Sequence, residues 1–168
     1  MGTTFVSLSR KPSAEDPGFW MRDSMLEVWL RLLALHLPEP TDAGEYTHTP
    51  RIRGQWLLAS LGHFMGWVPH GMEDACATED GKATVRLAIT SLLHALGQSE
   101  APVDANTLNL LGIDRQFTTP IERRWLRDIG HAFLDLLDNK IAQVASSTEV
   151  MPGSKPYVRP PTSSVSGG

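Results

Sequence analysis

The chain has 168 residues, of which 41% are hydrophobic and 20% are charged, and its net charge is −4 with the histidines neutral. This composition is typical of an ordinary folded domain and excludes a disordered chain, a collagen-like repeat and a disulfide scaffold. A protein of 18.5 kDa buries roughly 70% of the surface of its unfolded chain, which suffices for one hydrophobic core, so we expect a single domain.

The cysteine content and the N-terminal residues predict a cytoplasmic protein. Cys76 is the only cysteine, so no disulfide can form within the chain, as is usual in a reducing compartment. The first eight residues lack the basic and apolar regions of a signal peptide. The most apolar stretch, residues 28–37, is too short to cross a bilayer, so we expect no membrane partner.

Both ends of the chain differ in composition from its middle. Residues 1–12 are expected to be loosely ordered, although Phe5, Val6 and Leu8 suit a short extended piece docked on the body. Residues 146–168 contain four Pro, three Gly, six Ser and two Thr, and such a segment is predicted to be a disordered tail. The helical domain is therefore assigned to residues 13–145.

The first helix is expected over residues 16–36. It begins at Asp16-Pro17, a capping side chain followed by proline at the first helical position. Its apolar residues fall on one side at helical spacing, and the other side is polar, with Arg22, Asp23, Glu27 and Arg31. Two prolines then end the helix and open a long acidic loop.

Further helices are expected at 50–63, 80–96 and 120–144, with short ones at 72–77 and 104–111. The strongest start signal is a capping box with proline at the first helical position, from Thr119 to Glu122. No segment longer than four residues alternates like a strand rich in β-branched residues. The predicted fold is all-α, a compact bundle of four main helices plus one or two short helices, followed by the disordered tail.

The common catalytic motifs are missing. The chain has no glycine-rich phosphate loop, no His-Glu-x-x-His and no Cys-x-x-Cys. Ser60 lies in a predicted helix and lacks the glycine two residues before it that a hydrolase nucleophile elbow has. The sequence therefore favours a binding protein over an enzyme, and it implies no cofactor.

Five candidate metal ligands nevertheless lie within fourteen residues: His63, His70, Glu73, Asp74 and Cys76. Their spacing lacks the tight pairs of a structural zinc site, and the competing interpretation is a polar corner between helices with Cys76 in the core. Each long helix also carries one histidine, as a metal site in the core of a bundle requires, but only His36 and His63 fall on apolar stripes, and the competing interpretation is that these two are core residues bonded to the last carbonyls of their helices. A metal-binding bundle or a metal-dependent enzyme is therefore the alternative functional hypothesis.

Charge is distributed unevenly along the chain. Residues 115–127 carry four Arg against one Glu, but Trp125 there belongs to an inner helical stripe and the whole protein is acidic, so we expect no nucleic-acid partner. Residues 32–81 carry only two Arg against seven acids: Glu39, Asp42, Glu45, Glu73, Asp74, Glu79 and Asp80. If these acidic loops lie at one end of the bundle, they form a negative rim that attracts a basic partner, whereas the competing interpretation is that they only keep the protein soluble.

Trp67 lies in a glycine-flanked turn with large apolar neighbours. Such a turn either closes the end of the bundle as a lid, which we favour, or exposes an anchor of the kind found at interface hot spots. We expect a bacterial-type cytosolic protein that binds a protein partner through the seven acids and Trp67. An immunity- or antitoxin-like inhibitor of a basic partner is one example.

Overall fold

The computed structural model of the chain describes residues 2–11, 13–64, 66–147 and 151–161. These residues form a two-stranded antiparallel sheet and six helices, so the fold is mixed α/β. In chain order the elements are β1 (Thr3–Ser7), β2 (Gly18–Arg22), α1 (Asp23–His36), α2 (Thr49–Ala59), α3 (Met72–Ala75), α4 (Glu79–Leu96), α5 (Ala105–Asn109) and α6 (Arg123–Leu137).

The hairpin of β1 and β2 shows that the prediction of an all-α bundle is wrong. β2 falls within the expected first helix, yet it pairs with β1, with Val6 opposite Phe19 and Phe5 opposite Trp20. Val6 and Phe19 are buried in the core, whereas Phe5 and Trp20 are half-buried on the other face, with their ring centroids 5.3 Å apart. Side chains that alternate between two faces in this way define a strand, and α1 begins only at Asp23.

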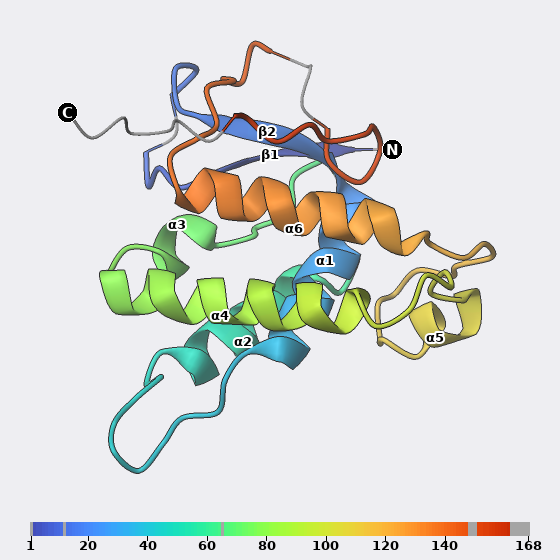
Figure 1. Cartoon of the computed structure of the whole chain (residues 1–168), viewed down its shortest axis with the longest axis horizontal. Helices are drawn as coiled ribbons and strands as arrows, with labels where there is room; N and C mark the ends of the chain where they lie inside the picture. Colours follow the sequence, from blue (N-terminus) through green and yellow to red (C-terminus); the bar gives the residue numbers. More distant parts are fainter. Residues whose placement is uncertain (1, 12, 65, 148–150, 162–168) are drawn as a thin grey trace.

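α1 is the central helix of the fold. It packs against α2, α4 and both strands, and it runs behind α6 and α4 in the view of Figure 1. Residues 26–30 are all buried, so the helix has no solvent face over more than one full turn. Glu27, which we expected on a polar side, is therefore enclosed in the core. No helix among the described residues is both long and apolar enough to span a bilayer.

The other long helices lie close to their expected positions but differ at their ends. α4 agrees with the prediction within one residue, and the Thr78 side chain caps it by accepting a hydrogen bond from the Gly81 N–H at 3.1 Å. α2 ends at Ala59, four residues before the predicted end. α6 lacks the predicted capping box, because the backbones of Ile121 and Val103 exchange two hydrogen bonds of 2.9 Å and hold Ile121 outside the helix.

α6 also ends at Leu137, seven residues before the predicted end. The Asn139 N–H donates to the carbonyl of Leu136 at 3.1 Å, and the Lys140 N–H donates to that of Asp135 at 2.8 Å. These are the two hydrogen bonds of a Schellman motif, and Asn139 has the left-handed conformation that the motif needs, with φ +56°. The chain then continues beside β2 instead of extending the helix.

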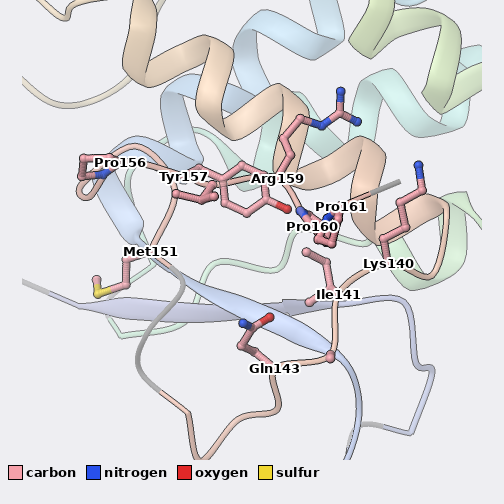
Figure 2. Close-up of a pocket in the computed structure, with 11 residues that line it drawn as sticks. Lys140, Ile141, Gln143, Met151, Pro156, Tyr157, Arg159, Pro160 and Pro161 are labelled. Atoms are coloured by element: carbon pink, nitrogen blue, oxygen red, sulfur yellow. The ribbon is translucent and has the colours of Figure 1, made fainter. Parts of the chain in front are cut away.

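Residues 151–161, which belong to the predicted disordered tail, form a strap along α6 (Figure 2). Asp135 of α6 is 1% exposed and accepts hydrogen bonds from the Tyr157 hydroxyl at 2.9 Å and from Arg159 Nη2 at 2.7 Å. A cavity of about 410 Å³ lies beside the strap and is lined by Ile141 and by prolines of the strap (Figure 2). The prediction of disorder is wrong for this stretch, while residues 148–150 and 162–168 lie outside the described residues.

Candidate functional site

The two acidic segments predicted from the sequence lie at one end of the molecule. Figure 1 shows the loop after α1, α3 and the start of α4 on the same side, away from α5. Glu45 and Asp80 line one cavity of about 270 Å³, which places the two segments in direct proximity. We call this region the acidic end and define it by its seven carboxylates: Glu39, Asp42, Glu45, Glu73, Asp74, Glu79 and Asp80.

Part of this negative charge is neutralised within the chain. Three carboxylates pair with basic side chains: Glu39 with Arg53 at 2.8 Å, Asp74 with Arg10 at 3.4 Å and Glu79 with Lys82 at 3.6 Å. Asp42, Glu45 and Asp80 are exposed and form no ion pair with any described residue. These three carboxylates therefore carry charge that a basic partner can neutralise.

Trp67 is 60% exposed, so it does not close the end of the molecule as a lid. The neighbouring Val68 is fully buried instead, and its N–H donates a hydrogen bond of 2.8 Å to the Thr4 hydroxyl of β1. The indole of Trp67 lies beside the outer face of the hairpin and lines a cavity of about 410 Å³ there. The turn is thus fixed by Val68, and the side chain of Trp67 remains exposed.

This cavity, which we call the aromatic cavity, joins residues that are far apart in the sequence. Phe5 of β1, Trp20 of β2 and Trp67 supply its aromatic wall, and Glu73 of α3 and Arg10 line it as well. Its volume falls within the range of roughly 300 to 1,000 Å³ that ligand pockets occupy. Of the residues that we predicted to bind a partner, Trp67 and Glu73 meet here.

Glu73 has a buried oxygen without a hydrogen-bond donor. The neighbouring His70 is 6% exposed, with Nε2 3.3 Å from the Phe5 carbonyl and Nδ1 accepting from the Met72 N–H at 3.1 Å. Burial lowers the pKa of His70 more than Glu73 raises it, so the ring is neutral at neutral pH and these contacts place its proton on Nε2. Glu73 Oε2 lies 3.3 Å from Nδ1, which has no proton to donate, and no other described group bonds this oxygen.

The five candidate metal ligands do not come together. His63 pairs with Asp114 at 3.1 Å, and both ring nitrogens of His70 are used by backbone groups. Burial raises the pKa of the Cys76 thiol to about 12, which keeps the thiol protonated at neutral pH. Within the described ranges, no three His, Cys, Asp or Glu side chains are placed to hold one metal ion. Among the residues that the structure describes, the five candidates therefore do not gather at one metal site.

The sequence analysis missed several residues that shape this end of the molecule. Phe5 and Trp20 form part of the aromatic cavity, and the run of β-branched and aromatic residues from Thr3 to Val6 is the signal that points to a strand there. Glu27 was expected in solvent, yet it is fully buried, accepts a hydrogen bond of 3.1 Å from Arg115 Nε and forms an ion pair with Arg115 Nη2 at 3.0 Å. Because Glu27 lies in a run of consecutive buried residues of α1, we assign it a role in the stability of the core and not in binding.

No protein-family model, curated protein or solved structure matches the chain. Its function is therefore inferred from the chemistry of the acidic end and of the aromatic cavity.

Replacing Trp67 by Ala should change the free energy of unfolding by less than about 1 kcal/mol, because most of this side chain is already in water. Urea titration followed by circular dichroism measures the change. Trp56→Ala is the matched control, since Trp56 is fully buried and its truncation should cost several times more. A loss of about 3 kcal/mol or more in Trp67→Ala would restore the lid interpretation.

Proposed function

We propose that the protein acts by binding another protein whose contact surface is basic. The observation that carries this proposal is the combination of exposed carboxylates and an exposed tryptophan at one end of the molecule. Exposed aromatic residues supply binding energy at the centres of interfaces, and surrounding charges select the partner and speed its approach. The acidic end supplies exposed carboxylates over α3, the start of α4 and the loop after α1, and Trp67 adjoins it at the aromatic cavity, which Trp67 and Glu73 both line.

The charges favour a partner that is basic over an extended surface. Asp42, Glu45 and Asp80 are exposed without a counter-ion among the described residues, and the pairs of Asp74 and Glu79 are also exposed. Such charges act mainly on the association rate, through attraction that salt screens over a Debye length of about 8 Å at physiological ionic strength. An immunity- or antitoxin-like protein that masks the basic surface of a bacterial cytoplasmic partner is the form of activity that we propose.

Neutralising four carboxylates tests this proposal. The variant Glu73→Gln, Asp74→Asn, Glu79→Gln, Asp80→Asn should retain its helical circular dichroism and lose most of its capacity to capture a basic protein from a cell extract. Surface substitutions of this kind alter stability by no more than about 0.5 kcal/mol each. The immobilised wild-type chain and the variant are compared in the same extract, and the captured protein is identified and its isoelectric point determined.

A second variant with the same net charge controls for nonspecific effects. It carries Glu100→Gln, Asp104→Asn, Asp114→Asn and Glu122→Gln, four exposed acids outside the acidic end. Asparagine replaces Asp104 as an equally effective cap of α5, so the fold is retained. The proposal expects the control to capture the partner like the wild type. Equal losses in both variants, or a captured protein that is itself acidic, would contradict it.

A further inference from the structure

We propose that the aromatic cavity receives an arginine side chain of the partner and that Glu73 pairs with its guanidinium. This inference rests on the proposed function, because it names the group through which the basic partner is anchored. The cavity provides an aromatic wall together with a carboxylate, which are the two kinds of group that bind a cation in proteins.

The aromatic wall suits a flat cation. Phe5 and Trp20 are cross-strand neighbours whose ring centroids are 5.3 Å apart and whose ring planes are inclined by 59°, and Trp67 lines the cavity from the loop before α3. A guanidinium stacks on aromatic faces and is more weakly hydrated than the ammonium of lysine, so it enters such a cavity at lower cost. The chain shows the same contact elsewhere, where Arg124 lies 4.9 Å from the centre of the Trp125 ring.

One oxygen of the Glu73 carboxylate has no hydrogen-bond donor among the described residues. This buried oxygen, Oε2, faces the unprotonated Nδ1 of His70 at 3.3 Å and makes no hydrogen bond with any described group. No described Lys or Arg side chain pairs with Glu73, so a guanidinium in the cavity supplies a counter-charge through the oxygen of this carboxylate that remains accessible. A guanidinium carries five N–H donors and can reach the carboxylate while it lies on the aromatic wall.

Arg10 shows that a guanidinium is accommodated at the mouth of the cavity. It lines the cavity and pairs with Asp74 of α3 at 3.4 Å, with most of its side chain in water. This pair leaves Glu73 free, but the positive charge of Arg10 opposes the entry of a second cation. Removal of Arg10 should therefore strengthen cation binding, in the opposite direction to removal of Glu73.

The test uses N-acetyl-arginine amide, with N-acetyl-citrulline amide as its uncharged counterpart. Titration of the full chain is followed by the NMR shifts of the tryptophan indole N–H groups, and the signal lost in Trp67→Ala identifies that residue. The arginine derivative should shift the Trp67 signal with a millimolar dissociation constant, and the citrulline derivative should bind at least about tenfold more weakly.

Two pairs of variants with equal net charge separate the cavity from general attraction. Glu73→Gln should weaken arginine binding about tenfold, while Glu79→Gln, at an exposed residue outside the cavity, should change it less than about twofold. Arg10→Gln should strengthen binding about twofold or more, whereas Lys11→Gln, next to it but outside the cavity lining, should not. Circular dichroism confirms that each variant is folded.

Equal binding of the arginine and citrulline derivatives, or equal effects of Glu73→Gln and Glu79→Gln, would overturn the inference. In that case the proposed function stands if the variant with four neutralised carboxylates still fails to capture the partner. If the arginine derivative binds but that variant captures the partner as well as the wild type does, the proposed function is overturned. The claim that the arginine comes from the partner is then overturned as well.

Discussion

Deleting residues 151–168 should lower the melting temperature by about 6 to 12 °C. The strap supplies the donors to the buried carboxylate of Asp135, from the Tyr157 hydroxyl and from the Arg159 guanidinium. Their loss removes hydrogen bonds to a charged group, which are worth about 1.5 to 3 kcal/mol each, so the deletion should cost about 3 kcal/mol or more. Each kcal/mol shifts the melting temperature of a domain of this size by about 2 to 4 °C. Thermal unfolding of the full-length and shortened chains measures the difference.

A second substitution shows whether the loss arises at Asp135. Asp135→Asn removes the charged acceptor of these hydrogen bonds, so it should destabilise the full-length chain and cost much less in the shortened chain, where the donors are already gone. An unchanged melting temperature on deletion would mean that the strap contributes nothing, in agreement with the disordered tail predicted from the sequence.

Replacing Arg115 by Ala should destabilise the protein by about 2 to 3 kcal/mol at pH 7. Arg115 is the cation beside Glu27, which is fully buried and whose Oε1 has no hydrogen-bond partner among the described residues. Burial raises the pKa of Glu27 above 4.5 even with Arg115 present, and loss of the arginine should raise it further. A raised carboxyl pKa costs stability as the pH rises from the unfolded value through the folded one, so the loss in Arg115→Ala should grow once the pH passes the folded pKa of Glu27 in the wild type, which lies above 4.5.

The double variant Glu27→Gln, Arg115→Ala isolates this interaction. With no carboxylate to compensate, Arg115→Ala should cost less than about 1 kcal/mol in the Glu27→Gln background. Urea unfolding of the four chains at pH 4 and pH 7 gives the coupling energy. The same cost in both backgrounds, or a cost independent of pH, would show that Arg115 acts through packing alone.

Local signals in the sequence were sufficient for several parts of the fold. The apolar stripe of α4 predicted its bounds within one residue, and a short helix was expected where α5 lies, with Asp104 now seen as its cap, accepting from the Thr107 N–H at 3.0 Å. The acidic end was also predicted as a set of residues, because local charge can be counted without knowledge of the fold. These features depend on neighbouring residues, whose spacing the sequence contains directly.

The hairpin was not predicted, because its two strands are short and the residues just before β2 resemble the start of a helix. Asp16-Pro17 matches a helix N-terminus, and Phe19 continues the apolar spacing of α1. The strand forms because Thr3–Ser7 offers a partner, and pairing between distant segments is not visible in a local pattern. The aromatic cavity depends on this pairing and was missed for the same reason.

The burial of Glu27 and Asp135 was missed because helical periodicity assumes that each helix has one solvent side. α1 is enclosed by α2, α4 and the sheet, so Glu27 has no access to solvent. Asp135 lies on the side of α6 that the strap covers, and only the folded chain shows that contact. In both cases tertiary packing decided which face of the helix is buried.

The salt dependence of partner association tests the central claim most directly, namely that the acidic end attracts and binds a basic protein. Stopped-flow measurements with the captured partner compare the wild type with the variant Glu73→Gln, Asp74→Asn, Glu79→Gln, Asp80→Asn from low to high ionic strength. We predict that the wild type associates about tenfold faster at low salt, and that the two rates converge when salt screens the charges. Equal rates and equal salt slopes for the two chains would contradict the claim and leave these carboxylates with no role beyond solubility.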